Sequence, residues 1–115
     1  MADDVATRFS KALELRISGD YDESVTLLKS VIAEQPSNAD AYHELGLVYS
    51  FQVADPCLPT LEYACRLSPQ NARYVLSYAK ALAMFGEFDR AKQMFEYILK
   101  LDPFNEEAKQ QLAYL

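Results

Sequence analysis

The side chains best suited to chemistry in this 115-residue chain are one histidine and two cysteines, and their number argues against a reaction centre. His43 is the single histidine, so it is the one candidate general base, and no second histidine is available to form a metal-binding pair. The chain also has no glycine-rich phosphate loop and no nucleophile motif built on serine or cysteine. We therefore expect no catalytic residues, no metal site and no cofactor, and we do not expect an enzyme.

Cys57 and Cys65 lie in one segment with a helical pattern. With a rise of about 1.5 Å per residue, their Cα atoms would be roughly 12 Å apart, too far for a disulfide. A zinc site would need two further ligands, and only His43 could join the thiols as a histidine. Both cysteines are therefore predicted to be small buried side chains with a structural role.

Charge and hydrophobicity narrow the possible partners. The formal net charge is -6 and the sequence pI is about 4.7, which disfavours binding to nucleic acid or to an anionic membrane surface. The first residues, MADDVATRFSK, lack the apolar segment of a secretory signal, and no apolar run approaches the roughly 20 residues that span a bilayer. The expected location is the cytoplasm. The acidic residues are scattered, which is typical of solvated helix surfaces.

The chain contains three copies of one unit of about 34 residues. The segment GDYDESVTLL begins at Gly19, and GEFDRAKQMF, with the same order of residue types, begins at Gly86. Three sets of residues keep the same spacing between copies: Asp22, Asp55 and Asp89; Pro36, Pro69 and Pro103; Asn38, Asn71 and Asn105. We expect a single domain over residues 1–115, with repeats at about 5–38, 39–71 and 72–105.

Each copy is predicted to form two helices. The asparagine can cap the first helix, the aspartate can cap the second, and the proline ends the second. In the second copy, Asp55 is expected to be the cap with Pro56 in the first helical position, and Pro59 is expected to loosen the first turn. The expected helices span residues 4–18, 22–35, 39–52, 55–68, 72–85, 89–101 and 106–115.

The last segment, residues 106–115, is predicted to be a capping helix. Ala108, Leu112 and Leu115 lie on one face of it, with a polar face opposite, as in the end unit of a stacked array. The same pattern also fits the first helix of a further repeat.

Small residues recur at one place in each predicted helix, where they would let neighbouring helices approach closely. In the first helices these are Ala12, Gly46 and Ala79, and in the second helices Ser24, Cys57 and Ala91. Two further spacing patterns occur: W-x2-L-G-x2-Y in a first helix, with tyrosine in place of the tryptophan, and A-x3-F with a terminal proline in a second helix. The matching residues are Tyr42, Leu45, Gly46 and Tyr49 in the second copy, and Ala91, Phe95 and Pro103 in the third.

Because these residues recur at the same places of a unit of about 34 residues, residues 5–105 resemble the tetratricopeptide repeat family. The resemblance implies an all-α fold, a right-handed superhelix of three helix-turn-helix repeats with a capping helix. It also implies a concave groove lined by the first helix of each repeat. The residues expected there form three columns: Phe9, His43 and Leu76; Leu13, Leu47 and Lys80; Ile17, Phe51 and Met84. The third column is equally compatible with burial. Arg73 lies beside the groove and would favour an acidic group next to the partner's apolar anchors.

The resemblance implies that the chain is a protein-protein interaction module or adaptor that binds a peptide or helix in an apolar groove. One family mode clamps the C-terminal carboxylate of heat-shock chaperones with lysine, asparagine and arginine. Those places hold Phe9, Leu13, Glu44, Arg73 and Ser77 here, and Glu44 would repel a carboxylate, so we do not expect this mode. Two alternatives remain open: a chaperone of the type III secretion class, and a structural domain that self-associates.

Overall fold

The computed structural model describes residues 4–115, and all regular structure in that range is helical. The helices are α1 (Val5–Ser18), α2 (Tyr21–Glu34), α3 (Ala39–Gln52), α4 (Cys57–Leu67), α5 (Ala72–Met84), α6 (Phe88–Leu101) and α7 (Glu106–Ala113). The expected all-α repeat fold is confirmed. No helix within these residues is long and apolar enough to cross a membrane.

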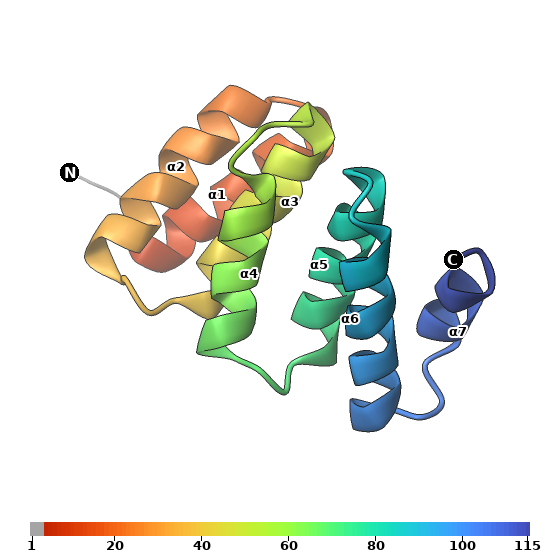
Figure 1. The fold of residues 1–115 in the computed structure, drawn as a ribbon. Coiled ribbons are helices and arrows are strands. Elements are labelled where there is room, and N and C mark those ends of the chain that lie inside the picture. The colour runs from red at the N-terminus through yellow and green to blue at the C-terminus, as the bar shows by residue number, and fades with distance from the viewer. Residues whose placement is uncertain (1–3) are drawn as a thin grey trace.

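The helices pack as three successive pairs, α1 with α2, α3 with α4 and α5 with α6, followed by α7 against α6 (Figure 1). Helix α3 also contacts α1 and α5, so the first helices of the pairs form one layer. The body is elongated, 50 × 24 × 21 Å. The turns within pairs lie along the upper edge in Figure 1, and the loops between pairs lie along the lower edge.

Asparagine side chains begin three of the helices, as predicted. The side-chain oxygens of Asn38, Asn71 and Asn105 accept the backbone N–H groups of Ala41, Tyr74 and Ala108 at 3.0, 3.2 and 2.9 Å. Asp4 caps α1 in the same way through the N–H of Thr7 at 2.7 Å, which holds the pKa of its carboxyl below the usual value. Each cap satisfies an amide that has no partner within its helix.

The predicted aspartate caps of the second helices are wrong. Helices α2 and α6 begin at Tyr21 and Phe88, one residue before Asp22 and Asp89, and their N-cap positions make no side-chain cap hydrogen bond. Asp22 and Asp89 therefore lie within the first turn. There a carboxylate is stabilised by the helix dipole rather than by capping.

The turn of the second copy also differs from the prediction. Helix α4 begins at Cys57, with Pro56 rather than Asp55 as its N-cap. Pro59 is thus the third helical residue, where an amide has no helical acceptor in any case, and the first helical bond runs from the Thr60 N–H to the Pro56 carbonyl at 3.1 Å. The proline removes no helical hydrogen bond. The break between the two helices of this copy is confirmed, since α3 ends at Gln52.

The small residues lie at the contact between paired helices. Ala12, Ala79, Ser24, Cys57 and Ala91 are all fully buried, and Gly46 is buried as well. In two copies the pair is joined by a hydrogen bond: the Ser24 hydroxyl donates to the Ala12 carbonyl at 2.8 Å, and the Cys57 thiol donates to the Gly46 carbonyl at 3.6 Å. The close approach expected from the sequence is therefore present.

The two cysteines are free thiols in α4. Cys57 is fully buried as expected, whereas Cys65 is only half-buried, so the prediction of burial holds for the first alone. Burial raises the pKa of both thiols to about 11, which keeps them protonated at neutral pH. Protonated thiols are weak nucleophiles and weak metal ligands.

Helix α7 covers part of α6. Ala108 is fully buried and Leu112 packs against the core. The helix ends at Ala113, two residues earlier than predicted, and Leu115 is therefore exposed rather than on the packed face. Lys80 of α5 forms an ion pair with Glu107 of α7 at 2.8 Å, which adds a polar link between these helices.

Val53 has a left-handed backbone conformation, with φ of 50°, at the place that glycine occupies in the other two copies. Gly19 and Gly86 have φ values of 87° and 84° there. A β-branched side chain in this conformation destabilises the folded state by about 1–2 kcal/mol. Glycine removes this strain, but it loses more conformational entropy on folding, which offsets about 0.5–1 kcal/mol of the gain. We expect Val53→Gly to raise the free energy of unfolding by about 0.5–1 kcal/mol.

Urea denaturation at neutral pH would measure this change. Val53 is 63% exposed, so the substitution removes little packing. Val53→Ala is the matched control, because alanine loses the branch but keeps the Cβ and its strain. A glycine variant less stable than wild type would show that strain at this turn is not the dominant energy.

Candidate binding groove

A hollow of about 270 Å³ opens between α3 and α5. It is lined by Leu47, Ser50, Phe51, Ser77, Lys80, Ala81 and Met84. Four of these, Leu47, Phe51, Lys80 and Met84, belong to the columns predicted from the sequence. The lining is mainly apolar, and its charged member, Lys80, is paired with Glu107.

The third predicted column is exposed, which answers the question of whether it is core. Ile17, Phe51 and Met84 are 76%, 55% and 49% exposed. The Phe51 ring stacks on Tyr21 of α2, with centroids 5.8 Å apart and planes 9° apart. This contact orients Phe51 while leaving part of its surface open.

The first two columns differ in depth. Leu13 and Leu47 are half-buried and, among the described residues, do not belong to the hydrophobic core cluster. Phe9 and Leu76 are also half-buried, but they pack against that cluster. The accessible apolar surface therefore consists of Leu13 and Leu47 from the second column and of all three residues of the third column.

His43 does not line the groove, contrary to the prediction. It is only 3% exposed, its ring stacks on Tyr74 at a centroid distance of 4.7 Å, and its Nε2 forms a hydrogen bond of 2.8 Å with the Ser77 hydroxyl. Its Nδ1 has no hydrogen-bond partner. Burial, together with the nearby Arg73 and Arg16, lowers the pKa of His43 to about 4, so the ring is neutral at physiological pH.

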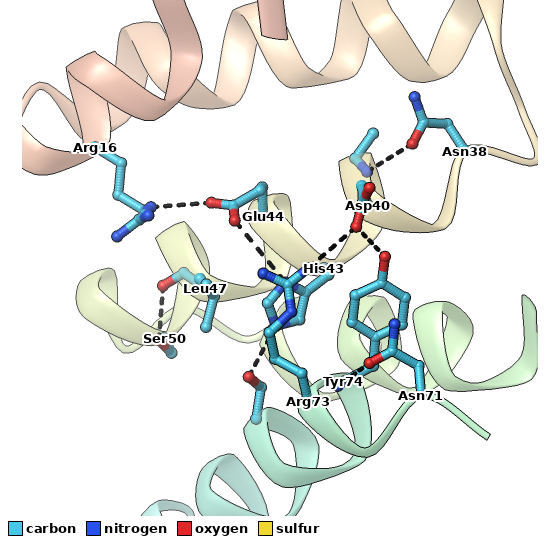
Figure 2. A network of polar contacts seen from close by, with 12 residues as sticks. Arg16, Asn38, Asp40, His43, Glu44, Leu47, Ser50, Asn71, Arg73 and Tyr74 are labelled. Atoms are coloured by element: carbon cyan, nitrogen blue, oxygen red, sulfur yellow. Dashed lines mark hydrogen bonds and ion pairs between the residues drawn. The ribbon is translucent and has the colours of Figure 1, made fainter. Parts of the chain in front are cut away.

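His43 belongs to a polar network that joins α1, α3 and α5 (Figure 2). The Arg16 Nε donates to Glu44 Oε2 at 3.0 Å, and Glu44 Oε1 lies 3.9 Å from His43 Nδ1. Burial raises the pKa of Glu44, and the Arg16 guanidinium opposes that shift. At the other end, Arg73 pairs with Asp40 at 3.3 Å, and the Tyr74 hydroxyl donates to the same carboxylate.

The contacts run from the Ser77 hydroxyl to the His43 ring and on toward the Glu44 carboxylate, as they do in the serine–histidine–acid triad of a hydrolase. The geometry does not support that chemistry. The 3.9 Å between His43 Nδ1 and Glu44 is too long for a hydrogen bond, and Glu44 is already held by Arg16. A buried imidazole with a pKa of about 4 is a weak base at neutral pH. Within residues 4–115 there is no group of three or more histidine, cysteine, aspartate or glutamate residues that could hold a metal ion.

The pairing of these groups was missed in the sequence analysis, although a signal for it exists. His43 and Ser77 are 34 residues apart, and so are Asp40 and Tyr74. Residues at the same place in successive copies face each other in a stacked array. Comparing positions one repeat apart would therefore have identified both contacts. Arg73, predicted to favour an acidic group of a partner, forms an ion pair with Asp40 of this chain.

Residues 8–52 match a family model described as a TPR repeat. The comparison with curated proteins found no match. Among solved structures, the first TPR of Spaghetti (RPAP3) bound to the HSP90 peptide SRMEEVD superposes with a TM-score of 0.90. It is 19% identical in sequence, and the match covers 96% of this chain and 88% of that one.

Two structures of MamA are also similar. MamA MSR-1 has a TM-score of 0.83 and 28% identity, with 97% of this chain and 65% of that chain covered. MamA AMB-1 has a TM-score of 0.83 and 27% identity, with 96% and 61% covered. The present chain thus spans less than two thirds of either MamA chain. These likenesses cover all three helix pairs, whereas the family model covers α1 to α3.

Proposed function

Because this chain has the tetratricopeptide-repeat fold and matches a TPR repeat at residues 8–52, we propose that it is an interaction module that binds a segment of a protein partner in the groove between α3 and α5. The observation that carries the proposal is the hollow of about 270 Å³ with exposed Phe51 and Met84 on its wall. A hollow of this size accepts one large apolar side chain of a partner.

The peptide in the RPAP3 structure supports this class of function without supplying its detail, since the two chains are only 19% identical. A carboxylate clamp in this chain would use the places of Glu44 and Arg73. Glu44 is a buried anion held by Arg16, and Arg73 is paired with Asp40. The one cation at those places, Arg73, is therefore shared with a carboxylate of the chain itself, and the proposed partner is held by apolar anchors instead.

The test is selection of a random displayed peptide library on the whole chain, followed by affinity measurements on variants. We expect Leu47→Gln to weaken the enriched peptides at least about tenfold, because it places an amide against the partner's apolar anchor. Leu47 is half-buried and outside the core cluster, so the melting temperature should change little.

Phe104→Gln is the matched control, since Phe104 is 82% exposed and lies in the loop between α6 and α7. It should leave affinity unchanged. Enriched peptides that bind Leu47→Gln as well as wild type would reject the groove. If no peptide is enriched and the mass of wild type, but not of Leu47→Gln, rises with concentration, the surface is a contact between copies of the chain.

A further inference from the structure

The groove opens onto an exposed apolar edge of the molecule. This turn edge consists of the turns within the three pairs, residues 17–23, 51–55 and 84–89, which lie together along the upper edge of Figure 1. Its exposed apolar side chains are Ile17, Phe51, Val53, Met84 and Phe88, each 49% exposed or more. Phe51 and Met84 also line the hollow, so the groove and the edge form one continuous surface.

The same edge is strongly acidic. Six exposed carboxylates lie on it, those of Asp20, Asp22, Glu23, Asp55, Glu87 and Asp89, and the three segments contain no lysine, arginine or histidine. None of the six forms an ion pair within the described residues, although Asp20 and Asp22 accept hydrogen bonds from Ser18 and Gln52. The carboxylates that do form ion pairs with lysine or arginine lie elsewhere: Glu34, Asp40, Glu44, Glu62, Glu106 and Glu107.

We propose that the turn edge selects a partner segment that is both basic and apolar, with lysine or arginine lying over the turns while an apolar anchor enters the hollow. This inference rests on the proposed function and specifies the chemistry of its partner. Charge complementarity favours this occupant, because none of the six carboxylates forms an ion pair within the described residues, and the one lysine that shares a hollow with two of them is Lys11. It also revises the sequence expectation of an acidic partner, which depended on Arg73.

Other occupants fit less well. A second copy docking by the same edge would bring two sets of six carboxylates together, and an anionic membrane would be repelled. A metal ion is not favoured, since the described residues contain no group of three or more ligands arranged to hold one. A polypeptide cation has charges spread along its length, as the carboxylates are spread along the three turns.

Part of the acidity also stabilises the protein itself. Asp22, Glu23 and Asp89 lie in the first turns of α2 and α6, where the helix dipole favours negative charge. The dipole accounts for the charges but not for the five exposed apolar side chains beside them. Exposed apolar side chains bordered by charged ones are a feature of interaction surfaces.

The test uses three synthetic amphipathic peptides of about 14 residues that share leucines at helical spacing and carry lysine, glutamate or glutamine elsewhere. Fluorescence anisotropy would measure their binding to the whole chain. We expect the lysine peptide to bind at least about tenfold more tightly than the glutamate peptide at low salt, with the difference shrinking at high salt. Equal affinities for the two would overturn the proposal.

A matched pair of variants locates the effect. Asp55→Asn with Glu87→Gln removes two edge charges, and Glu96→Gln with Glu106→Gln removes two charges away from the edge. We expect the first pair to weaken the lysine peptide by roughly 3–10-fold and the second by less than about twofold. An equal effect of both pairs would show that net charge alone attracts the peptide.

Failure of this inference and failure of the groove give different results. If Leu47→Gln weakens all three peptides while lysine and glutamate peptides bind alike, the groove stands and the charge selection is wrong. If Leu47→Gln weakens none of them while the edge pair still weakens the lysine peptide, the edge binds cations and the groove is wrong.

Discussion

Replacing Gly46 by alanine is expected to lower the free energy of unfolding by about 2–3 kcal/mol, although alanine is the better helix former by about 1 kcal/mol. A Cβ at this position would lie 2.3 Å from Leu61 Cδ2, 2.5 Å from Leu61 Cγ and 3.3 Å from the Leu61 backbone nitrogen. Leu61 is only 1% exposed, so it has no room to move away. Helices α3 and α4 must then separate, and the core between them loses contact.

Urea denaturation and thermal unfolding would measure the loss, with a fall in melting temperature of roughly 8–12 °C for a chain of this size. Gly86→Ala is the control for a glycine-to-alanine change without a clash, since nothing lies within 4 Å of the Cβ that would be added there. Its φ of 84° still makes the variant strained, so a loss of about 1 kcal/mol is expected.

A double variant tests the cause. Leu61→Ala removes the atoms that the new Cβ would meet, so Gly46→Ala with Leu61→Ala should be less destabilised than the sum of the two single variants by about 1 kcal/mol or more. Strict additivity would show that the loss does not come from this contact. A Gly46→Ala protein as stable as wild type would mean that the paired helices tolerate a wider spacing.

The fold was predictable from the sequence because its determinants are local and repeated. Asn38, Asn71 and Asn105 each accept the backbone N–H three residues further on, and a proline follows the end of α2, α4 and α6 by two residues. The small residues mark the contacts between helices independently of any side-chain detail. The same residue types occur at the same places in three copies, so a wrong helix boundary in one copy does not change the predicted architecture.

The errors at the second helices have a local cause. After Gly19 and Gly86 the chain needs one linking residue, and the helix begins directly at Tyr21 or Phe88. An aspartate at the start of a helical pattern predicts an N-cap, but an aspartate within the first turn also stabilises the helix, through the helix dipole. In the second copy the glycine is replaced by Val53, and the start of α4 at Cys57 makes Pro59 harmless.

The site was less predictable because its contacts join different copies. Leu47, Phe51, Lys80 and Met84, which the resemblance and the repeat spacing predicted on a groove, line the hollow between α3 and α5. His43 has the same spacing, yet it is turned inward by its hydrogen bond to Ser77 and its stacking on Tyr74. Spacing along one helix identifies a face, whereas the depth of a residue on that face depends on the neighbouring helix.

The burial of His43 should make the stability of the protein depend on pH. In the unfolded chain a histidine binds a proton below a pKa of about 6.5, whereas in the folded chain His43 does so only below about 4. Between these values the unfolded state binds more protons, so the free energy of unfolding decreases as the pH falls. The contribution is fully present above pH 6.5 and is lost progressively toward pH 4.

Several charged groups around the ring set the size of this effect. Arg73 and Arg16 disfavour protonation of His43, and Asp40 favours it. Glu44 acts in the opposite direction: its raised pKa lets the folded state bind a proton before the unfolded state does, which adds stability as the pH falls toward its unfolded value. A measurement on wild type alone would therefore combine both contributions.

His43→Gln separates the two contributions, because a glutamine amide can replace the hydrogen bond between His43 Nε2 and the Ser77 hydroxyl but does not titrate. Between pH 7.5 and pH 5, wild type is expected to lose about 2 kcal/mol of stability more than this variant. Urea denaturation at both pH values measures the difference, while Glu44 and Asp40 remain unchanged in the two proteins. Equal pH dependence of wild type and His43→Gln would show that the imidazole is protonated in the folded state as readily as in the unfolded one. The assignment of His43 as a neutral imidazole within the network of Figure 2 would then be wrong.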